Sequence, residues 1–335
     1  MDELLAGLRA AGEPTRLRLL AILAKSELTV TELTQILRQS QPRVSRHLKL
    51  LCEAGLLDRF REGSWVFYRR SQSGAGLKLA GLLTGLIPAD DQTIARDMER
   101  LDAVRSARSE RAAEFFRENA DQWNRIRSLH VAEASVEQAI LKFAGGGAQP
   151  VGNYVDLGTG TGRMIELIGP RAQTSLGIDL SPEMLAFARA KLDQLAIEHC
   201  SLRQGDLYDL PLGDEVADLV TLHQVLHYLD DPAAAVGEAA RILKPGGRLL
   251  IADFAPHELD FLREEQAHRR LGFGEDEVKS WLAAAGLELS ETRRLLPPED
   301  DEGATLTVVI YAADKPADNK VTRSQRRPEL EGTSA

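Results

Sequence analysis

A glycine-rich turn stands where an apolar strand pattern gives way to a helix. Its glycines are Gly158, Gly160 and Gly162. Glycine permits a tight turn and lets a ligand approach the backbone closely. A dinucleotide-binding fingerprint would have its third glycine at the position of Arg163, and Asp156 inside the preceding strand would repel a pyrophosphate. The turn therefore favours a cationic ligand that carries an amino group.

Two more acids end the strands that follow this turn. Asp179 ends the second predicted strand, where a carboxylate can accept hydrogen bonds from both ribose hydroxyls. Asp206 follows the third predicted strand, where it can bind the amino group of an adenine. Doubly wound sheets bind ligands at the carboxyl ends of their strands, so the acids predict a nucleoside site.

Three histidines follow the fourth and fifth predicted strands and are candidate catalytic bases, namely His223, His227 and His257. Imidazole titrates near neutral pH and can take a proton from a substrate. Tyr228 and Asp253 are further candidates in the same two loops. The alternative is that the first two histidines, four residues apart, are packed and hydrogen-bonded within the fold. They have no evident third ligand, so we expect no metal site.

A basic helix is predicted over residues 41–54, after Ser40 and before Gly55. Its solvent face carries Gln41, Arg43, Ser45, Arg46, His47 and Lys49. Arginine and glutamine have the donor geometry to read guanine and adenine edges in the major groove of DNA. A solvated basic helix without a nucleic-acid role is the alternative.

The elements around this helix predict a winged helix-turn-helix. Two helices broken at Gly12 precede it, and Thr31 is expected to cap a helix over residues 32–37. A hairpin of strands 56–61 and 65–69 follows it. The hairpin carries three arginines that we expect to neutralise DNA phosphates, which are Arg59, Arg61 and Arg69.

Charge is spread unevenly over the 335 residues, which carry 41 basic and 51 acidic side chains. Residues 1–75 hold 12 basic and 8 acidic side chains, a net charge of +4, whereas the remainder hold 29 and 43, a net charge of −14. Only the first segment can face a polyanion. The two cysteines, Cys52 and Cys200, exclude a disulfide framework and suit a reducing cytosol. We expect no membrane span, no signal peptide and a cytoplasmic location.

Residues 75–150 are predicted to be helical and to connect two domains. Apolar residues recur there at near-heptad spacing, at Ile94, Met98, Leu101 and Val104. This seam predicts a long helix that pairs with a second copy of the chain. Packing of the seam on the same chain is the alternative. A further helix over residues 123–137 is a candidate cover for a ligand.

Strands and helices alternate from Tyr154 onward, which predicts a doubly wound α/β sheet. The chain is therefore expected to be multidomain. The expected domains are a mainly α winged helix with a β-hairpin (1–75), a helical dimerisation and linker region (76–147), an α/β domain (148–314) and a disordered tail (315–335).

Three segments of the first domain resemble the ArsR/SmtB family of dimeric winged-helix repressors, over about residues 5–72. These are GEPTRL at 12–17, QPRVSRHLKLL at 41–51 and EAGLL at 53–57. The resemblance implies a homodimer that binds a double-stranded DNA operator. Thr29 and Thr31 stand where thiol-sensing members carry cysteines, and no histidine occurs between His47 and His130. Metal sensing is therefore not expected.

Residues 150–313 resemble the class I S-adenosylmethionine-dependent methyltransferase fold. The resemblance rests on the glycine turn, Asp179, Asp206 and the segment LKPGG at 243–247. It implies a Rossmann-like sheet of seven strands with the last antiparallel. It assigns to the S-adenosylmethionine site Asp156, Gly158, Thr159, Gly160, Gly162, Asp179, Leu180, Asp206, Leu207 and His223.

Two functions remain open at this point. One is a transcriptional regulator whose methyltransferase domain responds to S-adenosylmethionine or S-adenosylhomocysteine. The other is an active small-molecule methyltransferase whose winged helix serves autoregulation or dimerisation. An enzyme whose winged helix only dimerises is a weaker third possibility, because the basic helix has the residues of a DNA reader. The small-molecule methyl acceptor is not specified by the sequence.

Overall fold

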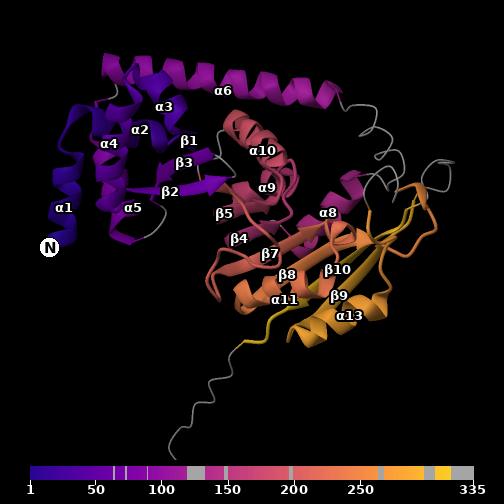
Figure 1. The fold of residues 1–335 in the computed structure, drawn as a ribbon. Coiled ribbons are helices and arrows are strands. Elements are labelled where there is room, and N and C mark those ends of the chain that lie inside the picture. Colours follow the sequence, from indigo (N-terminus) through magenta and orange to yellow (C-terminus); the bar gives the residue numbers. More distant parts are fainter. Residues whose placement is uncertain are drawn as a thin grey trace, which may run out of the picture.

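The computed structural model describes residues 1–62, 65–71, 74–88, 90–118, 133–146, 150–195, 199–262, 268–297 and 306–317, without the side chains of residues 62, 109 and 111–118. These residues form a small helical unit, a larger α/β unit and one long helix that runs over both (Figure 1). The predicted cover helix lies outside the described residues as far as residue 132. So does the predicted tail from residue 318.

The small unit contains a helix-turn-helix followed by a hairpin. Its elements are α1 (Asp2–Ala11), α2 (Pro14–Leu23), β1 (Leu28–Thr29), α3 (Val30–Leu37), α4 (Gln41–Glu53), β2 (Leu57–Glu62) and β3 (Trp65–Arg70). The three strands form one antiparallel sheet in the order β1-β3-β2. Gly55, with φ +68°, ends α4 as predicted, because a left-handed residue after a helix lets its last carbonyls be satisfied.

The predicted cap of α3 was misplaced by two residues. The helix begins at Val30, and its N-cap is Thr29 rather than Thr31. The Thr29 hydroxyl accepts a hydrogen bond from the Glu32 amide at 3.3 Å, and the Glu32 carboxylate accepts one from the Thr29 amide at 2.8 Å. This reciprocal capping box needs an acid three residues after the cap, which Thr29 has and Thr31 lacks.

The predicted partner of the heptad seam was wrong. The seam lies on α6 (Gln92–Glu118), which follows α5 (Gly74–Gly85). Leu101 and Val104 are 1% and 4% exposed, and they belong to the same core as Leu19 and Leu33 of the small unit. The apolar side of α6 is therefore covered by its own chain.

The larger unit is a seven-stranded sheet in the order β6-β5-β4-β7-β8-β10-β9. Its strands are β4 (Val151–Leu157), β5 (Ala172–Asp179), β6 (Cys200–Gln204), β7 (Ala217–His223), β8 (Leu243–Phe254), β9 (Glu288–Leu295) and β10 (Val308–Asp314). The strands β6, β5, β4, β7 and β8 pair in parallel, and β10 pairs antiparallel with both its neighbours. The predicted class I methyltransferase architecture is confirmed.

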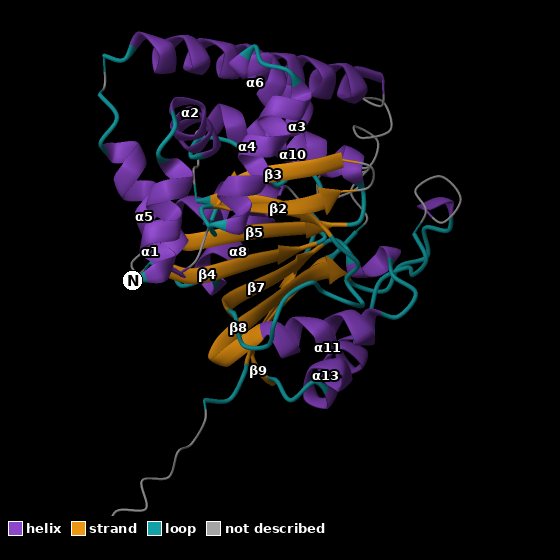
Figure 2. Ribbon diagram, turned by 60° about the vertical axis from the view of Figure 1, so that its left-hand side comes forward, coloured by secondary structure: helices purple, strands orange, loops and turns teal. Residues whose placement is uncertain are grey.

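Helices cover both faces of this sheet, each over its own apolar core. One core includes residues of α8 (Glu133–Phe143), α9 (Arg163–Ile168) and α10 (Pro182–Leu195). The other includes residues of α11 (Pro232–Ile242) and α13 (Glu275–Ala284). Figure 2 shows the hairpin of the small unit beside the sheet and α6 above α10. In the described part of the chain, no helix has the length and apolar character needed to span a bilayer.

Candidate functional site

The glycine turn joins β4 to α9 and leaves open space at its centre. Gly158, with φ +70°, admits no side chain because an added Cβ would lie 2.3 Å from Val225. Gly160, with φ +51°, has no described atom within 4 Å of the position of a Cβ. The amides of Gly158 and Thr159 donate to the Ile178 carbonyl at 2.8 and 2.9 Å, which fixes the turn against β5. A ligand can therefore lie over Gly160.

Asp156 supports this turn from beneath. Its carboxylate is 1% exposed and accepts hydrogen bonds from the hydroxyls of Thr159 at 2.6 Å and Thr221 at 2.5 Å. Burial raises the pKa of Asp156 to about 6, against the lowering effect of these two hydrogen bonds. The structure places Asp156 within the core beside the turn, where it positions the loop.

Asp179 lies at the end of β5, next to the open side of the turn. Its carboxylate accepts hydrogen bonds from the amides of Gly160 at 2.8 Å and Ser181 at 2.9 Å. Burial raises the pKa of Asp179 above its ordinary value. Leu180 beside it is 66% exposed. The partly buried carboxylate of Asp179 and the exposed side chain of Leu180 therefore lie together at the carboxyl end of β5.

Asp206, assigned to adenine, and Leu207, assigned to the same cofactor site, have different surroundings. Asp206 is exposed, and its carboxylate accepts a hydrogen bond from the Tyr208 amide at 3.0 Å. Leu207 is 6% exposed and belongs to a core of the sheet. Only the carboxylate and the backbone at this position can therefore face a ligand.

The three candidate histidines gather around Asp253. His227 is 2% exposed, and its Nδ1 lies 2.8 Å from the Asp253 carboxylate. That carboxylate also accepts hydrogen bonds from the amides of Leu226 and Phe254. Burial by itself would raise the pKa of Asp253. The charge and hydrogen bond of His227, together with the two amides, outweigh this effect, so the pKa lies below its ordinary value. The pair is a buried, fully hydrogen-bonded unit.

Burial lowers the pKa of the other two histidines of this cluster. Burial lowers the pKa of His223, at the end of β7, to about 4. Burial also lowers the pKa of His257, and His227 adds to the effect. The imidazole of His227 stacks near His268, with ring centroids 4.2 Å apart. The backbone carbonyl of His227 accepts hydrogen bonds from the amides of Arg269 and Arg270.

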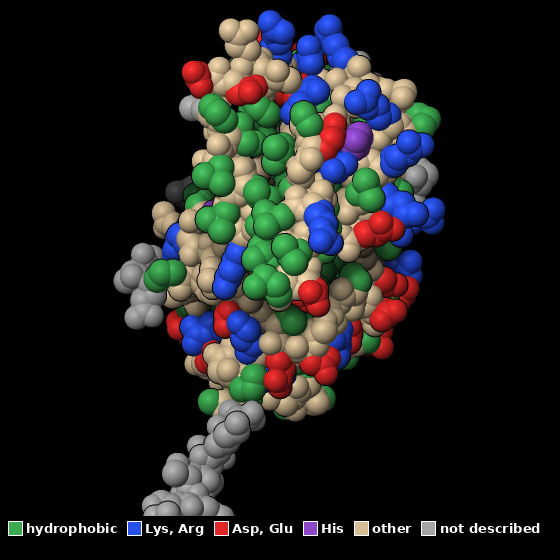
Figure 3. Space-filling view, turned by 90° about the vertical axis from the view of Figure 1, so that its left-hand side faces the viewer, with side chains coloured by type: hydrophobic (Ala, Val, Ile, Leu, Met, Phe, Trp, Pro, Cys, Tyr) green, Lys and Arg blue, Asp and Glu red, His purple; other side chains and the backbone are tan. Residues whose placement is uncertain are grey.

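The basic face of α4 is exposed to solvent. Gln41, Arg43, Arg46 and Lys49 are exposed, Ser45 is partly buried, and Arg61 is exposed on the hairpin. His47 is partly buried, with its Nδ1 3.6 Å from the Glu13 carboxylate, and burial lowers its pKa. Figure 3 shows this basic area beside a hydrophobic area on the same face of the molecule.

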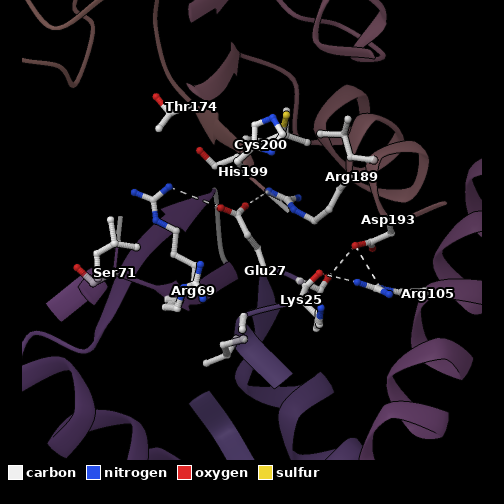
Figure 4. A pocket seen from close by; sticks show the side chains of 18 of the residues that line it. Lys25, Glu27, Arg69, Ser71, Arg105, Thr174, Arg189, Asp193, His199 and Cys200 are labelled. Atoms are coloured by element: carbon white, nitrogen blue, oxygen red, sulfur yellow. Dashed lines mark hydrogen bonds and ion pairs between the residues drawn. The ribbon is translucent and has the colours of Figure 1, made fainter. Parts of the chain in front are cut away.

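The position of Arg69 contradicts the prediction that this residue binds DNA phosphates. Its guanidinium points into the junction of the two units, where it lies 3.7 Å from Glu27 and 3.4 Å from Asp58. Arg189 and Arg203 of the methyltransferase unit pair with the same Glu27, at 3.7 and 3.1 Å. Figure 4 shows Glu27 between arginines of both units.

A second acid, Asp193 of α10, completes the junction. Its carboxylate accepts hydrogen bonds from Ser26 at 2.7 Å and Arg108 at 3.0 Å. The Arg108 guanidinium, 8% exposed, also donates to Glu32 at 2.8 Å. Sequence reasoning missed these residues because their partners lie 76–167 positions away and no local pattern marks them.

Two family models match the chain. Residues 13–59 match the bacterial regulatory proteins of the arsR family, and residues 155–251 match the methyltransferase domain. Together with the helix-turn-helix and the seven-stranded sheet, these matches define the class of protein. The chain joins an ArsR-type DNA-binding domain to a methyltransferase domain.

Several methyltransferases are similar to this chain in part. The uncharacterized methyltransferase YcgJ of Bacillus subtilis is 32% identical over 105 residues, which are 31% of this chain and 42% of that protein. The demethylmenaquinone methyltransferase of Thermus thermophilus is 38% identical over 104 residues, 30% of this chain and 47% of that protein. The chain thus spans less than half the length of these relatives. The solved structure of YcgJ has a TM-score of 0.47 and 21% identity, over 55% of this chain and 99% of that one.

Proposed function

We propose that the chain is a cytoplasmic DNA-binding regulator whose methyltransferase domain binds S-adenosylmethionine or S-adenosylhomocysteine. Occupancy of that site changes the affinity for an operator. The ArsR-type domain and the exposed basic face of α4 support the DNA-binding half. The match to a methyltransferase domain and the glycine turn support the ligand-binding half.

The residues around the turn fit an adenosyl ligand. Open space over Gly160 leaves room for the methionine part, with Gly158, Thr159 and Gly162 shaping the turn. Asp179 is placed to hold the ribose, while Asp206 and the backbone at Leu207 face the adenine. When bound, S-adenosylmethionine supplies a methyl group already activated on a sulfonium. Asp156 acts indirectly, by holding Thr159.

The observation that carries the regulatory proposal is that α10 contacts both halves of the molecule. An added Cβ on Gly162 of the turn would lie 3.0 Å from Ala188 of α10. The neighbouring Arg189 and Asp193, on the same helix, pair with Glu27 and Ser26 of the DNA-binding domain. A shift of α10 on ligand binding therefore reaches the DNA-binding domain directly. A hundredfold change in DNA affinity needs a free-energy difference of about 2.7 kcal/mol between the two arrangements.

Active methylation of a small molecule is the second candidate, and the histidine cluster favours it. His223 ends β7 at the ligand-binding edge of the sheet. Burial lowers its pKa to about 4, so the imidazole is neutral at pH 7 but is a weaker proton acceptor than an ordinary histidine. His227, paired with Asp253, is placed to position this loop, and His257 is a further candidate base.

We also propose a homodimer formed through α1 and α5 instead of α6. Large apolar side chains are exposed on these two helices and directly after α5, at Leu4, Leu5, Leu8, Leu77, Leu82 and Leu86. Figure 3 shows the hydrophobic area to which they belong. A second copy would bury this area and place two α4 helices for two half-sites of DNA. Sedimentation should give a dimer, and Leu82→Glu with Leu86→Glu should give a monomer; a dimer that survives both substitutions contradicts this face.

Titration calorimetry tests the regulatory proposal directly. S-adenosylmethionine and S-adenosylhomocysteine are each titrated into the protein, alone and with DNA from its own promoter. The proposal predicts that DNA changes ligand affinity, because linkage is reciprocal. Tight binding that is indifferent to DNA would reject the regulator and leave the enzyme. No binding of either ligand would reject both.

A further inference from the structure

A cavity of about 210 Å³, partly open to solvent, lies between the DNA-binding and methyltransferase units. Both units and α6 contribute to its walls, as Figure 4 shows. Its lining includes Glu27, Arg69, Arg105, Thr174, Asp193 and Cys200. Since a water molecule takes up about 30 Å³ of liquid, the cavity has room for a compact solute.

This cavity is separate from the glycine turn. Thr174 lies near the start of β5, whereas Asp179 ends that strand. Five residues of a strand span about 16 Å. Cys200 likewise begins β6. The cavity is therefore at the amino ends of these strands, opposite the edge where sheets of this kind bind their ligands.

The lining of the cavity carries more positive than negative charge. Its cations are Lys25, Arg69, Arg70, Arg105 and Arg189, and its acids are Glu27 and Asp193. Arg203, adjacent to the cavity, pairs with Glu27 as well. One carboxylate thus faces three guanidinium groups, while Arg69 and Arg105 also pair with Asp58 and Asp102, which lie outside the lining.

Two of these guanidinium groups also have unused hydrogen-bond donors. Arg69 Nε and Nη1 and Arg105 Nε are buried, and no described atom accepts a hydrogen bond from them. Their ion pairs, at 3.7 and 3.4 Å for Arg69 and 3.5 Å from Arg105 Nε to Asp193, are longer than hydrogen bonds. Buried donors without acceptors are costly, so a small shift of either side chain toward an acceptor in the cavity would be stabilising.

We propose that this cavity binds a small oxyanion, either inorganic phosphate or a small phosphate monoester. A phosphate group offers several acceptor oxygens and negative charge, which match the converging guanidinium donors. Because Arg69 belongs to the DNA-binding unit and Thr174 and Cys200 line the cavity from the methyltransferase unit, the bound anion lies between the two units. The site is a second one, and it does not depend on the proposed adenosyl site.

The two cysteines allow a test in the unmodified protein. Cys200 lines the cavity, Cys52 lies on α4, both are partly buried, and burial raises the pKa of each thiol to about 11. A thiol reagent is applied with increasing inorganic phosphate or glycerol phosphate, with sodium chloride matching the ionic strength, and each site is followed by peptide mass spectrometry. At an anion concentration about ten times Kd, modification of Cys200 should slow about tenfold while that of Cys52 is unchanged.

The result identifies the anion as well. If only one of the two compounds slows the modification of Cys200, the result supports the site and identifies that compound as its ligand. Equal rates at Cys200 with and without both compounds would overturn the proposal. Equal slowing of Cys200 and Cys52 would also overturn it, because it would indicate a general effect of the anion.

Substitution of the donors gives an independent test. Arg69→Gln and Arg105→Gln should each weaken phosphate binding at least tenfold by calorimetry, whereas Arg293→Gln, an exposed arginine on β9, should not. Binding of S-adenosylhomocysteine is measured on the same samples and should be unchanged, which shows that the variants are folded. Wild-type phosphate affinity in both cavity variants would refute the assignment.

Discussion

Two helices of the N-terminal half, α4 and α6, carry arginines with opposite surroundings. Arg43 and Arg46 of α4 are exposed, and no acid of the described residues pairs with them. Arg100 and Arg108 of α6 are partly or fully buried, and both are paired with acids. The first pair is available to a polyanion outside the molecule, and the second is used within it.

The difference shows that a basic helix acquires its role from the acids that its neighbours supply. Arg108 meets Glu32 of the DNA-binding domain and Asp193 of the methyltransferase unit. Within the part of the chain that the structure describes, no acid pairs with Arg43 or Arg46, so the charge of these two arginines stays unbalanced. Substitutions in the two helices should therefore have separate effects, on DNA binding in one case and on domain docking in the other.

The largest expected effect is on DNA binding by α4. Arg43→Ala combined with Arg46→Ala should weaken operator binding by about 2–6 kcal/mol, because each well-placed arginine–base contact contributes about 1–3 kcal/mol. Fluorescence anisotropy with promoter DNA measures the loss. Thermal stability and affinity for S-adenosylhomocysteine should stay at wild-type values. Undiminished DNA binding would show that α4 does not read the operator.

Arg108→Ala should lower the stability of the protein. It leaves Glu32 and Asp193 without their buried partner, and breaking a buried ion pair costs about 3–5 kcal/mol. Urea unfolding followed by circular dichroism measures this cost. Arg43→Ala serves as the matched control and should change the free energy of unfolding by less than about 0.5 kcal/mol. Similar stabilities of the two variants would remove the contrast between α4 and α6.

Asp156 should make the methyltransferase domain less stable as pH rises. Because its pKa is raised in the folded state, to about 6, the folded protein binds the proton more tightly than the unfolded chain does. Relative to Asp156→Asn, the wild type should therefore lose up to about 3 kcal/mol between pH 4 and pH 7. Urea unfolding of both proteins over this pH range gives the difference.

That comparison must be made between the two proteins, since the wild-type curve alone mixes opposite contributions. Because the pKa of His223 is lowered to about 4, its contribution to the free energy of unfolding increases as the pH rises over the same range. The subtraction removes the contribution of His223. If the free energy of unfolding of the wild type minus that of Asp156→Asn stayed constant or rose with pH, the pKa of Asp156 would not be raised in the folded state.

Asp179→Ala has the smallest expected effect and sharpens the distinction between the two acids of the site. Loss of charge-assisted hydrogen bonds to the ribose should weaken binding of S-adenosylhomocysteine by about 1–3 kcal/mol. Calorimetry measures this, with Asp209→Ala, an exposed acid near the same edge, as the control. Equal affinities in wild type and Asp179→Ala would place Asp179 outside the site.

Features with a local cause could be predicted from the sequence. The strands of the sheet and the turn at Gly158 follow from apolar runs and from glycines that no side chain can replace. The recognition helix was bounded correctly by Ser40 and Gly55. The cap of α3 was also encoded locally, in the spacing of Thr29 and Glu32, and was overlooked.

Features that depend on distant partners could not be predicted. The apolar seam of α6 was recognised, but its partner was misassigned, because periodicity shows that a face is buried and not what covers it. Arg69 was expected on DNA because nothing near it in sequence identifies Glu27 as its partner. His227 was one of several candidate bases until its pairing with Asp253 was visible.

The two kinds of domain and the loops that bear their chemistry follow from local sequence patterns, since glycines, caps and alternating apolar residues act over a few positions. Tertiary structure decided which charged residues remain free and which are consumed by contacts. Hydrogen bonds and ion pairs form across any sequence separation once folding brings the groups together, as between Ser26 and Asp193. The junction of the two units and its cavity exist only for that reason.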